Sequence, residues 1–223
     1  MQKHEIRNAI KRKAQEDIHL ELAKIILLHD KENNLTFSDL PASRVAALRA
    51  RKKVSFDAPT SRKEAITQMA MLSNDVDDDG KRIFTDIENK IVAVTYVENI
   101  IFLTNHSQVA LGDGTFTYAP RYFIQTYTVH VCINNFYVHV ASFFLPSKHA
   151  STYTAMWWLL KKISLGITGK DLTIISILLL DYEIATHNGA RIVFPGIILR
   201  GCRFHLGQSW WKRIYGNSKL PNL

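Results

Sequence analysis

The sequence is poor in cysteine, with only Cys132 and Cys202 among its 223 residues. So few cysteines exclude a disulfide framework and are typical of a protein from a reducing compartment. No apolar run approaches the roughly 20 residues that a membrane-spanning helix requires. Residues 1–13 are charged and lack an apolar core, so they do not form a signal peptide. These absences predict a soluble intracellular protein that does not act at a membrane.

Acidic residues are missing from one long stretch, because no aspartate or glutamate follows Glu183. Across 107–223, eleven lysines and arginines stand against four acids, and this region carries nearly all of the net charge of +8. Such a balance favours an anionic partner such as nucleic acid. A basic surface that only maintains solubility is the alternative. A hydrophobic content of 47% is ordinary for a globular protein with a core.

Three helices are predicted in the first third of the chain from apolar spacings of three and four residues and from capping signals. Ser61 and Glu64 form a capping-box pattern at the start of the third helix. The second helix ends in a basic cluster that suits the negative end of a helix dipole, and a phosphate-binding or nuclear-import patch is the alternative. The helices span about 4–28, 41–53 and 61–72, and the cluster is Arg49, Arg51, Lys52 and Lys53.

An acidic segment follows these helices. Its residues Asp75, Asp77, Asp79, Gly80 and Asp86 occupy positions 1, 3, 5, 6 and 12 of a calcium-binding EF-hand loop. Position 12 is the shorter aspartate rather than glutamate, and an arginine stands at position 8, where an aliphatic residue is usual. We therefore interpret the segment as an acidic turn, with a calcium loop as the alternative.

From residue 91 onward the pattern changes to strands. Residues 91–103 favour a strand or a short buried helix, and a series of strands and helices follows. Its order is β-β-β-α-β-α-β-α, which predicts an α/β domain at 91–223 with a ribonuclease H-like mixed sheet, preceded by a basic helical extension at 1–90. The predicted strands are 108–112, 122–133, 136–145, 172–180 and 196–200, and the helices are 151–163, 182–193 and 207–215.

Asp113 and Asp181 follow two of the predicted strands. The three consecutive strands over 108–145 form an antiparallel meander. In a ribonuclease H-like sheet the first of them, 108–112, is the neighbour of the strand 172–180, so the two acids are expected to lie close together. Two adjacent carboxylates repel each other unless a cation lies between them. Carboxylates bind Mg²⁺ well, and paired divalent metals drive in-line attack on phosphodiesters. The alternative is that Asp113 belongs to an Asp-Gly turn and that Asp181 caps a helix.

A family resemblance adds to this interpretation. The run Asp113-Gly-Thr-Phe116, with Pro120, Phe123, Gln125 and His130 after it, resembles the opening of the transposase domain of Mutator-like elements. Over about residues 107–216 the likeness continues in order through Leu145-Pro-Ser-Lys148, Tyr153, Asp181-Tyr-Glu183, Phe194-Pro195 and Gly201-Cys-Arg-Phe-His-Leu-Gly-Gln208.

The resemblance implies a DDE-type transposase that cuts and joins DNA with Mg²⁺ or Mn²⁺. It implies that Asp113 and Asp181 are the first and second catalytic acids and the ligands of the metal. The implied partners are double-stranded DNA at transposon ends and further copies of the chain, in the nucleus.

The chain departs from the family in its third acid, a glutamate that belongs on a later helix. No acid follows Glu183, and Glu183 itself lies two residues past Asp181 and is expected to point elsewhere. The sequence therefore predicts a truncated core with two of the three metal-binding acids and weak or absent catalysis. The alternatives are a catalytically dead DNA-binding protein derived from a transposon and an interaction domain that uses the N-terminal amphipathic helix.

Cys202 and His205 match the Cys-x-x-His element of the same family. Zinc requires four ligands, or three and a water, and no second spaced pair is present. We interpret the two residues as a buried strand cysteine and a locally bonded histidine, with zinc binding as the alternative. Trp210 and Trp211 are predicted to contribute one ring to the core and one to the surface, with DNA stacking as the alternative.

Overall fold

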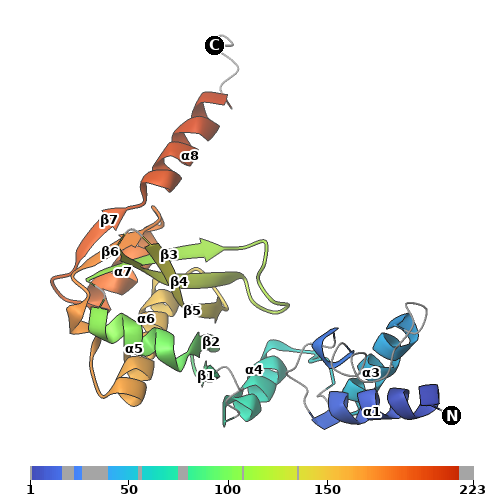
Figure 1. Ribbon diagram of the computed structural model, residues 1–223. Helices are drawn as coiled ribbons and strands as arrows, with labels where there is room; N and C mark the ends of the chain where they lie inside the picture. Colours follow the sequence, from blue (N-terminus) through green and yellow to red (C-terminus); the bar gives the residue numbers. More distant parts are fainter. Residues whose placement is uncertain are drawn as a thin grey trace. The chain divides into compact units, whose positions relative to one another are not determined.

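The structure is a computed structural model, and it describes residues 2–16, 23–26, 40–54, 57–74, 80–106, 108–134 and 136–215. The chain is a mixed α/β protein with N-terminal helices and a seven-stranded mixed sheet (Figure 1). It divides into two compact units, Met1–Pro59 and Thr60–Leu223. No helix in the described ranges is long and apolar enough to cross a bilayer.

The first unit is built from helices α1 (Gln2–Glu16) and α3 (Leu40–Val54), with a further helical piece at 23–26. Its core consists of Ile6, Ile10, Ala14, Ile25, Ile26 and Ala47. Ile6, Ile10 and Ala14 of α1, which stand four residues apart, therefore face this core. Arg51 of the basic cluster donates a hydrogen bond from Nε to the Ala14 carbonyl at 3.3 Å. This cation therefore binds a carbonyl in the last turn of α1.

The second unit opens with helix α4 (Arg62–Met71) and confirms the predicted capping box. The Ser61 hydroxyl accepts a hydrogen bond from the Glu64 amide at 3.2 Å. The Glu64 carboxylate accepts one from the Thr60 amide at 2.8 Å, one residue earlier than in the usual pattern. Hydrogen bonds from the Thr60 backbone and side chain lower the pKa of Glu64.

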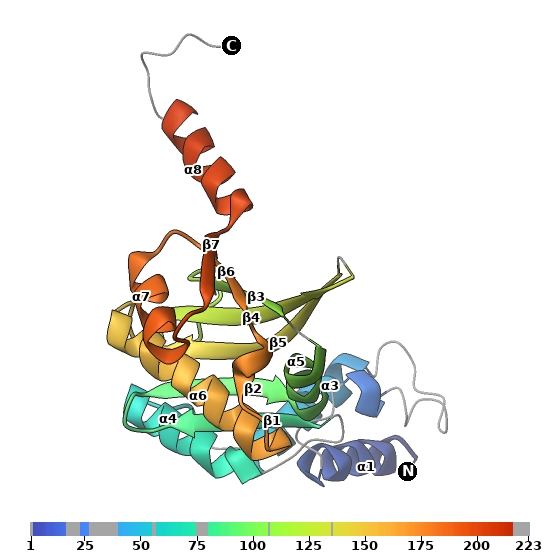
Figure 2. The same ribbon diagram turned by 90° about the vertical axis from the view of Figure 1, so that its left-hand side faces the viewer.

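The sheet has the strand order β1-β2-β5-β4-β3-β6-β7 (Figure 2). Neighbouring strands from β1 to β3 are antiparallel, whereas β6 and β7 extend the sheet in parallel. The strands are β1 (Lys81–Asp86), β2 (Ile91–Tyr96), β3 (Val109–Thr115), β4 (Gln125–Ile133), β5 (Phe136–Leu145), β6 (Ile177–Leu180) and β7 (Ile198–Gly201).

The predicted order of elements is confirmed as β3-β4-β5-α6-β6-α7-β7-α8. Residues 91–103 form both of the structures considered for them, β2 and then a helix. Strand β1 was not predicted, because its short charged sequence shows no apolar alternation. The helices are α5 (Val97–His106), α6 (Ala150–Thr168), α7 (Ile184–Val193) and α8 (Arg203–Tyr215), with single 3₁₀ turns η1 (Leu72–Asn74) and η2 (Leu172–Ile174).

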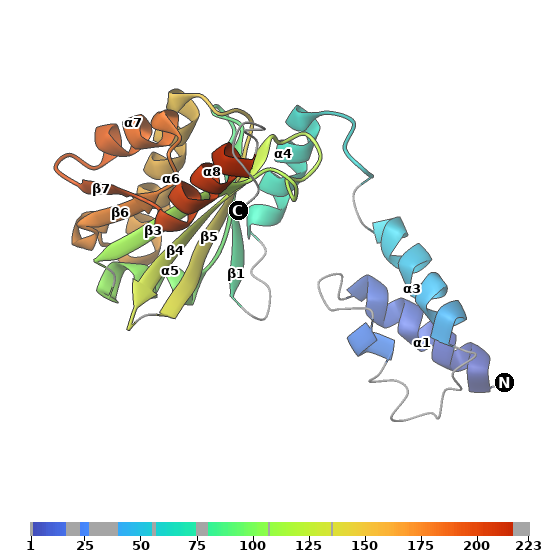
Figure 3. The same ribbon diagram turned by 90° about the horizontal axis from the view of Figure 1, so that it is seen from above.

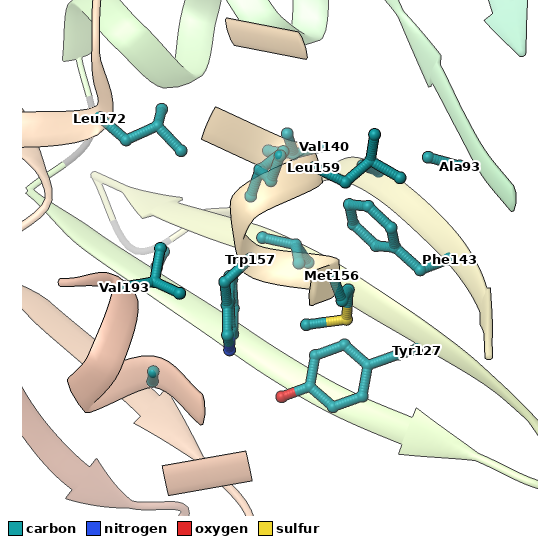
Figure 4. Packing of buried hydrophobic residues seen from close by; sticks show 14 of the residues in the cluster. Ala93, Tyr127, Val140, Phe143, Met156, Trp157, Leu159, Leu172 and Val193 are labelled. Carbon is teal, nitrogen blue, oxygen red and sulfur yellow. The ribbon is translucent and has the colours of Figure 1, made fainter. Parts of the chain in front are cut away.

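The core lies on one face of the sheet. In β4, Gln125, Tyr127, Val129 and Val131 are buried, and the residues that alternate with them are less buried. Helix α6 covers the buried face, and Figure 4 shows its Met156 and Trp157 beside Tyr127. Viewed from above, α6 and α7 lie on the same side of the strands (Figure 3).

The apolar run 172–180, which lacks alternation and so favours a strand buried on both faces, does not form one such strand, and this prediction was wrong. Only Ile177–Leu180 is a strand, and a 3₁₀ turn precedes it, where the Asp171 carboxylate accepts from the Leu172 amide at 2.7 Å. In β6 the buried residues, Leu178 and Leu180, alternate with half-buried ones. The alternation arises because the core lies on only one face of the sheet.

The calcium-loop frame falls largely outside the described residues, which include neither Asp75, Asp77 nor Asp79. Its last position, Asp86, ends β1. The Asp86 carboxylate accepts hydrogen bonds from the Asn89 backbone at 2.9 Å and the Asn89 side chain at 2.8 Å. An EF-hand would begin a helix here, whereas residues 81–86 form a strand that leads into a turn. This end of the frame therefore supports the interpretation as a turn.

Candidate functional site

The two predicted acids come to adjoining strand positions. Strands β3 and β6 pair in parallel up to Gly112 opposite Leu180, and the next residues are Asp113 and Asp181. Asp113 lies inside β3 and pairs with Thr128 of β4, so the Asp-Gly turn alternative is wrong. Helix α7 is capped by Glu183, so Asp181 does not occupy the N-cap position either.

Three hydrogen bonds hold the loop that carries Asp181. The Glu183 amide donates to Asp181 Oδ1 at 3.2 Å, and His187 Nε2 donates to the Asp181 carbonyl at 2.6 Å. The Cys202 amide donates to the Leu180 carbonyl at 2.7 Å. Side chain and backbone of Asp181 are thus held by separate donors, which restricts where its free carboxylate oxygen can point.

Asp113 faces a pocket on the less buried side of the sheet. Its side chain is 48% exposed, and its Oδ1 lies 3.4 Å from His205 Nε2 at the start of α8. The pocket has a volume of about 270 Å³, and its walls include His130, Cys202 and Phe204 as well as these two residues. The loop after β7 therefore brings the Cys-x-x-His element to the first acid.

The Tyr127 phenol lies on the buried face of the sheet, against Gly112, the residue before Asp113. Its ring is fully buried, and its hydroxyl has no hydrogen-bond partner among the residues that the structure describes. Burial raises the pKa of Tyr127 well above its ordinary value, and the charges of Asp181, Tyr153, Asp113 and Glu183 raise it further. The phenol is therefore neutral and able to donate a hydrogen bond.

A separate chain of polar groups lies beside Tyr127, whose ring centroid is 5.6 Å from that of Tyr153. Gln125 Nε2 donates to the Tyr153 hydroxyl at 2.7 Å, and that hydroxyl donates to Glu183 Oε2 at 3.0 Å. Burial raises the pKa of Tyr153, which is also neutral. Sequence reasoning missed this network. The sequence feature that could have revealed it is the pair Gln125 and Tyr127. Both are polar residues at buried positions of β4, where the alternation of buried and less buried residues predicts apolar side chains.

The donor set fits a single hard cation better than it fits zinc. Asp113 and Asp181 supply two carboxylates, and Mg²⁺ is commonly bound through one or two carboxylates with water completing its shell. Within the described ranges, no group of three or more histidine, cysteine or acidic side chains is placed to hold a metal ion. Cys202 precedes α8 rather than lying on a strand, and His205 faces Asp113. Zinc binding at this pair stays the untested alternative.

Comparison with known proteins adds nothing to this geometry. No family model, characterised protein or solved structure gives a significant match to the chain. The likeness to Mutator-like transposases therefore stays a prediction. The function has to be inferred from the chemistry of the site.

Two histidines next to the site should make stability depend on pH. His130 and His139 are paired across β4 and β5 with ring centroids 5.3 Å apart. Burial lowers the pKa of His130 below 6.5, although the charge of Asp113 opposes the shift. Burial also lowers the pKa of His139, and His130 lowers it further. As the pH falls, the two histidines of the unfolded chain are therefore protonated before those of the folded chain. Their contribution to the free energy of unfolding is complete above pH 6.5 and is lost as the pH falls below it.

We expect the double variant His130→Gln/His139→Gln to flatten this dependence. The measurement is the urea midpoint of unfolding at a series of pH values across the histidine range. His149→Gln, at an exposed position before α6, should keep the dependence of the parent. An unchanged pH profile in the double variant would show that other groups are responsible.

Proposed function

We propose that this chain is the core of a DNA transposase of Mutator-like type, with a ribonuclease H-like sheet and a divalent cation held by Asp113 and Asp181. The observation that carries the proposal is the parallel pairing of β3 with β6, which ends one residue before each acid. The strand order supports the proposal as well. In the order β5-β4-β3-β6-β7, the first strand of the meander, β3, is the neighbour of β6, the strand that follows α6.

Residues of this chain would each have a defined task in such a site. Asp113 and Asp181 would hold Mg²⁺ or Mn²⁺, which when bound neutralises phosphate charge and activates the attacking oxygen. The donors to the Asp181 loop orient one carboxylate, and His205 lies against the other. The buried Tyr127 phenol is neutral and adds no further negative charge near the acids. The proposed partner is double-stranded DNA at the ends of an element, and the proposed compartment is the nucleus.

We infer that Glu183 does not supply the third acid that a DDE site requires. Its carboxylate accepts a hydrogen bond from the Tyr153 hydroxyl. Among the described residues, no third histidine, cysteine or acidic side chain joins Asp113 and Asp181 in a group placed to hold a metal ion. We therefore expect this chain to bind a cation and DNA but to cleave and join strands weakly or not at all. The second candidate function, a catalytically dead transposon-derived DNA-binding protein, is favoured by the same observation.

The cation site is tested with Asp181→Asn. Removing one of two carboxylates should weaken Mn²⁺ binding by more than about ten-fold, because ligand charge largely sets affinity for a hard cation. The measurement is isothermal titration calorimetry with Mn²⁺ on the whole chain. The matched control is Glu88→Gln, an exposed acid in the turn after β1, which should bind as the parent does. Equal Mn²⁺ affinity for Asp181→Asn and the parent would refute the site.

Nicking of supercoiled DNA in Mn²⁺ separates the two candidate functions. Cleavage that is lost in Asp181→Asn would indicate an enzyme. DNA binding without any cleavage would indicate the inactive protein.

A further inference from the structure

Helix α8 exposes its aromatic side chains to solvent. Phe204 is 69% exposed, Trp210 61%, Trp211 60% and Tyr215 66%, and no residue of this helix is buried. The prediction that one of the two tryptophans packs in the core was therefore wrong. The reason is that α8 leads away from the sheet (Figures 1 and 2). So many large exposed rings on one helix mark an interaction surface.

Three of these rings follow one side of the helix. Trp211 and Tyr215 are four residues apart, and their ring centroids lie 4.0 Å apart at an interplanar angle of 38°. Phe204 stands seven residues before Trp211, which is about two helical turns and places it on the same side. The result is a row of flat apolar faces along the helix.

The charged side chains of the helix itself have a single sign. Arg203, Lys212 and Arg213 lie on α8, the exposed Arg200 precedes it in β7, and no acid occurs after Glu183. A second copy of the helix would bring the same positive charge to the contact, which opposes self-association through this face. The complementary partner is an anion that also carries flat rings, and nucleic acid combines both features.

The row also begins at the candidate site. Phe204 and His205 line the same pocket as Asp113, and His205 Nε2 lies 3.4 Å from the Asp113 carboxylate. A strand that lies along α8 would therefore have one end at the acids. A helix at an unrelated place on the surface would not have this relation to the site.

We propose that α8 binds an unpaired strand of nucleic acid. The bases stack on Phe204, Trp211 and Tyr215, and the phosphates contact Arg203, Lys212 and Arg213. The strand is unpaired because stacking on a side chain requires a free base face. The proposal deepens the proposed function and rests on it only for the role of the strand as a substrate. Binding itself requires neither metal nor catalysis.

The first experiment measures the binding of a fluorescein-labelled oligothymidylate to the full chain by fluorescence anisotropy in EDTA. Trp211→Ala and Tyr215→Ala should each weaken binding by about five-fold or more, the usual effect of removing one stacking ring. The matched control is Trp158→Ala in α6, a tryptophan that is 51% exposed and lies beside Lys161. It should bind as the parent does.

The second experiment tests the phosphate contacts. Lys212→Gln/Arg213→Gln should lower the slope of log affinity against log salt concentration by about 1.4, since each contact to a single strand contributes about 0.7. The control Lys162→Gln, an exposed cation of α6, should leave the slope unchanged. Circular dichroism checks that each variant is folded, which its exposed position leads us to expect.

The proposal is overturned if the parent does not bind the oligonucleotide or if the α8 variants bind it as well as Trp158→Ala does. It is also overturned if duplex DNA binds as tightly as the single strand through the same residues. A third contrary outcome is that the α8 variants change only the mass measured by light scattering, which would show that the helix mediates self-association. Because EDTA removes divalent cations, failure here does not affect the Mn²⁺ test at Asp181. Failure of that test would in turn leave strand binding by α8 intact.

Discussion

Replacing Gly112 with alanine is expected to lower the free energy of unfolding by about 3 kcal/mol, the upper end of the usual cost of overpacking a core. A Cβ at this position would overlap the Tyr127 hydroxyl and lie 2.9 Å from Leu180 Cδ2. Both neighbours are fully buried, so neither moves aside without disturbing the core. Asp113 is the next residue, so we also expect weaker Mn²⁺ binding from a shift of β3.

Two variants control for this effect. Gly166→Ala in α6 adds a Cβ that meets no atom within 4 Å. It should raise stability by up to about 1 kcal/mol, because alanine favours a helix over glycine. Tyr127→Phe removes the hydroxyl that the new Cβ would overlap, so combining it with Gly112→Ala should restore part of the lost stability.

Urea unfolding followed by circular dichroism measures the stability of the four variants and the parent. Tyr127→Phe alone should change stability little, because its hydroxyl has no hydrogen-bond partner among the described residues. A Gly112→Ala variant as stable as the parent would show that β3 and β4 do not pack in this way. Failure of Tyr127→Phe to rescue it would show that the phenol is not the obstacle.

The second large effect is expected at Trp157. Changing it to alanine should cost about 4 kcal/mol, as usual for truncating a buried tryptophan. Its ring is fully buried and meets the rings of Tyr127 at 6.1 Å and Phe194 at 5.7 Å, both edge to face. Figure 4 shows it between β4 and the segment that carries Val193. Trp157 thus packs between β4 and the end of α7.

The neighbouring residue supplies the matched control. Trp158→Ala removes the same side chain from a position that is 51% exposed, and its effect should stay within about 0.5 kcal/mol. Trp157→Phe should lie between the two alanine variants, because Trp157 Nε1 has no partner to lose in the described structure. Equal denaturant midpoints for the two alanine variants would contradict the assignment of the core face of α6.

The sequence by itself determined the order of the elements and much of their extent. The strand over 136–145 was predicted with its observed ends, and Ser61 and Glu64 marked the start of α4. These features depend on residues close together in the chain, where alternation and capping chemistry act directly. The two candidate acids were predicted for the same reason, because each stands at or beside an apolar strand.

Only the tertiary structure decided how these elements form the candidate site. The pairing of β3 with β6 places Asp113 beside Asp181, and the empty Cβ position of Gly112 accommodates Tyr127. Tertiary packing also decided which face of β6 is buried. It likewise left both Trp210 and Trp211 exposed, because no element packs over them in the described structure. Such contacts join residues that are distant in the chain, and local patterns do not record distant partners.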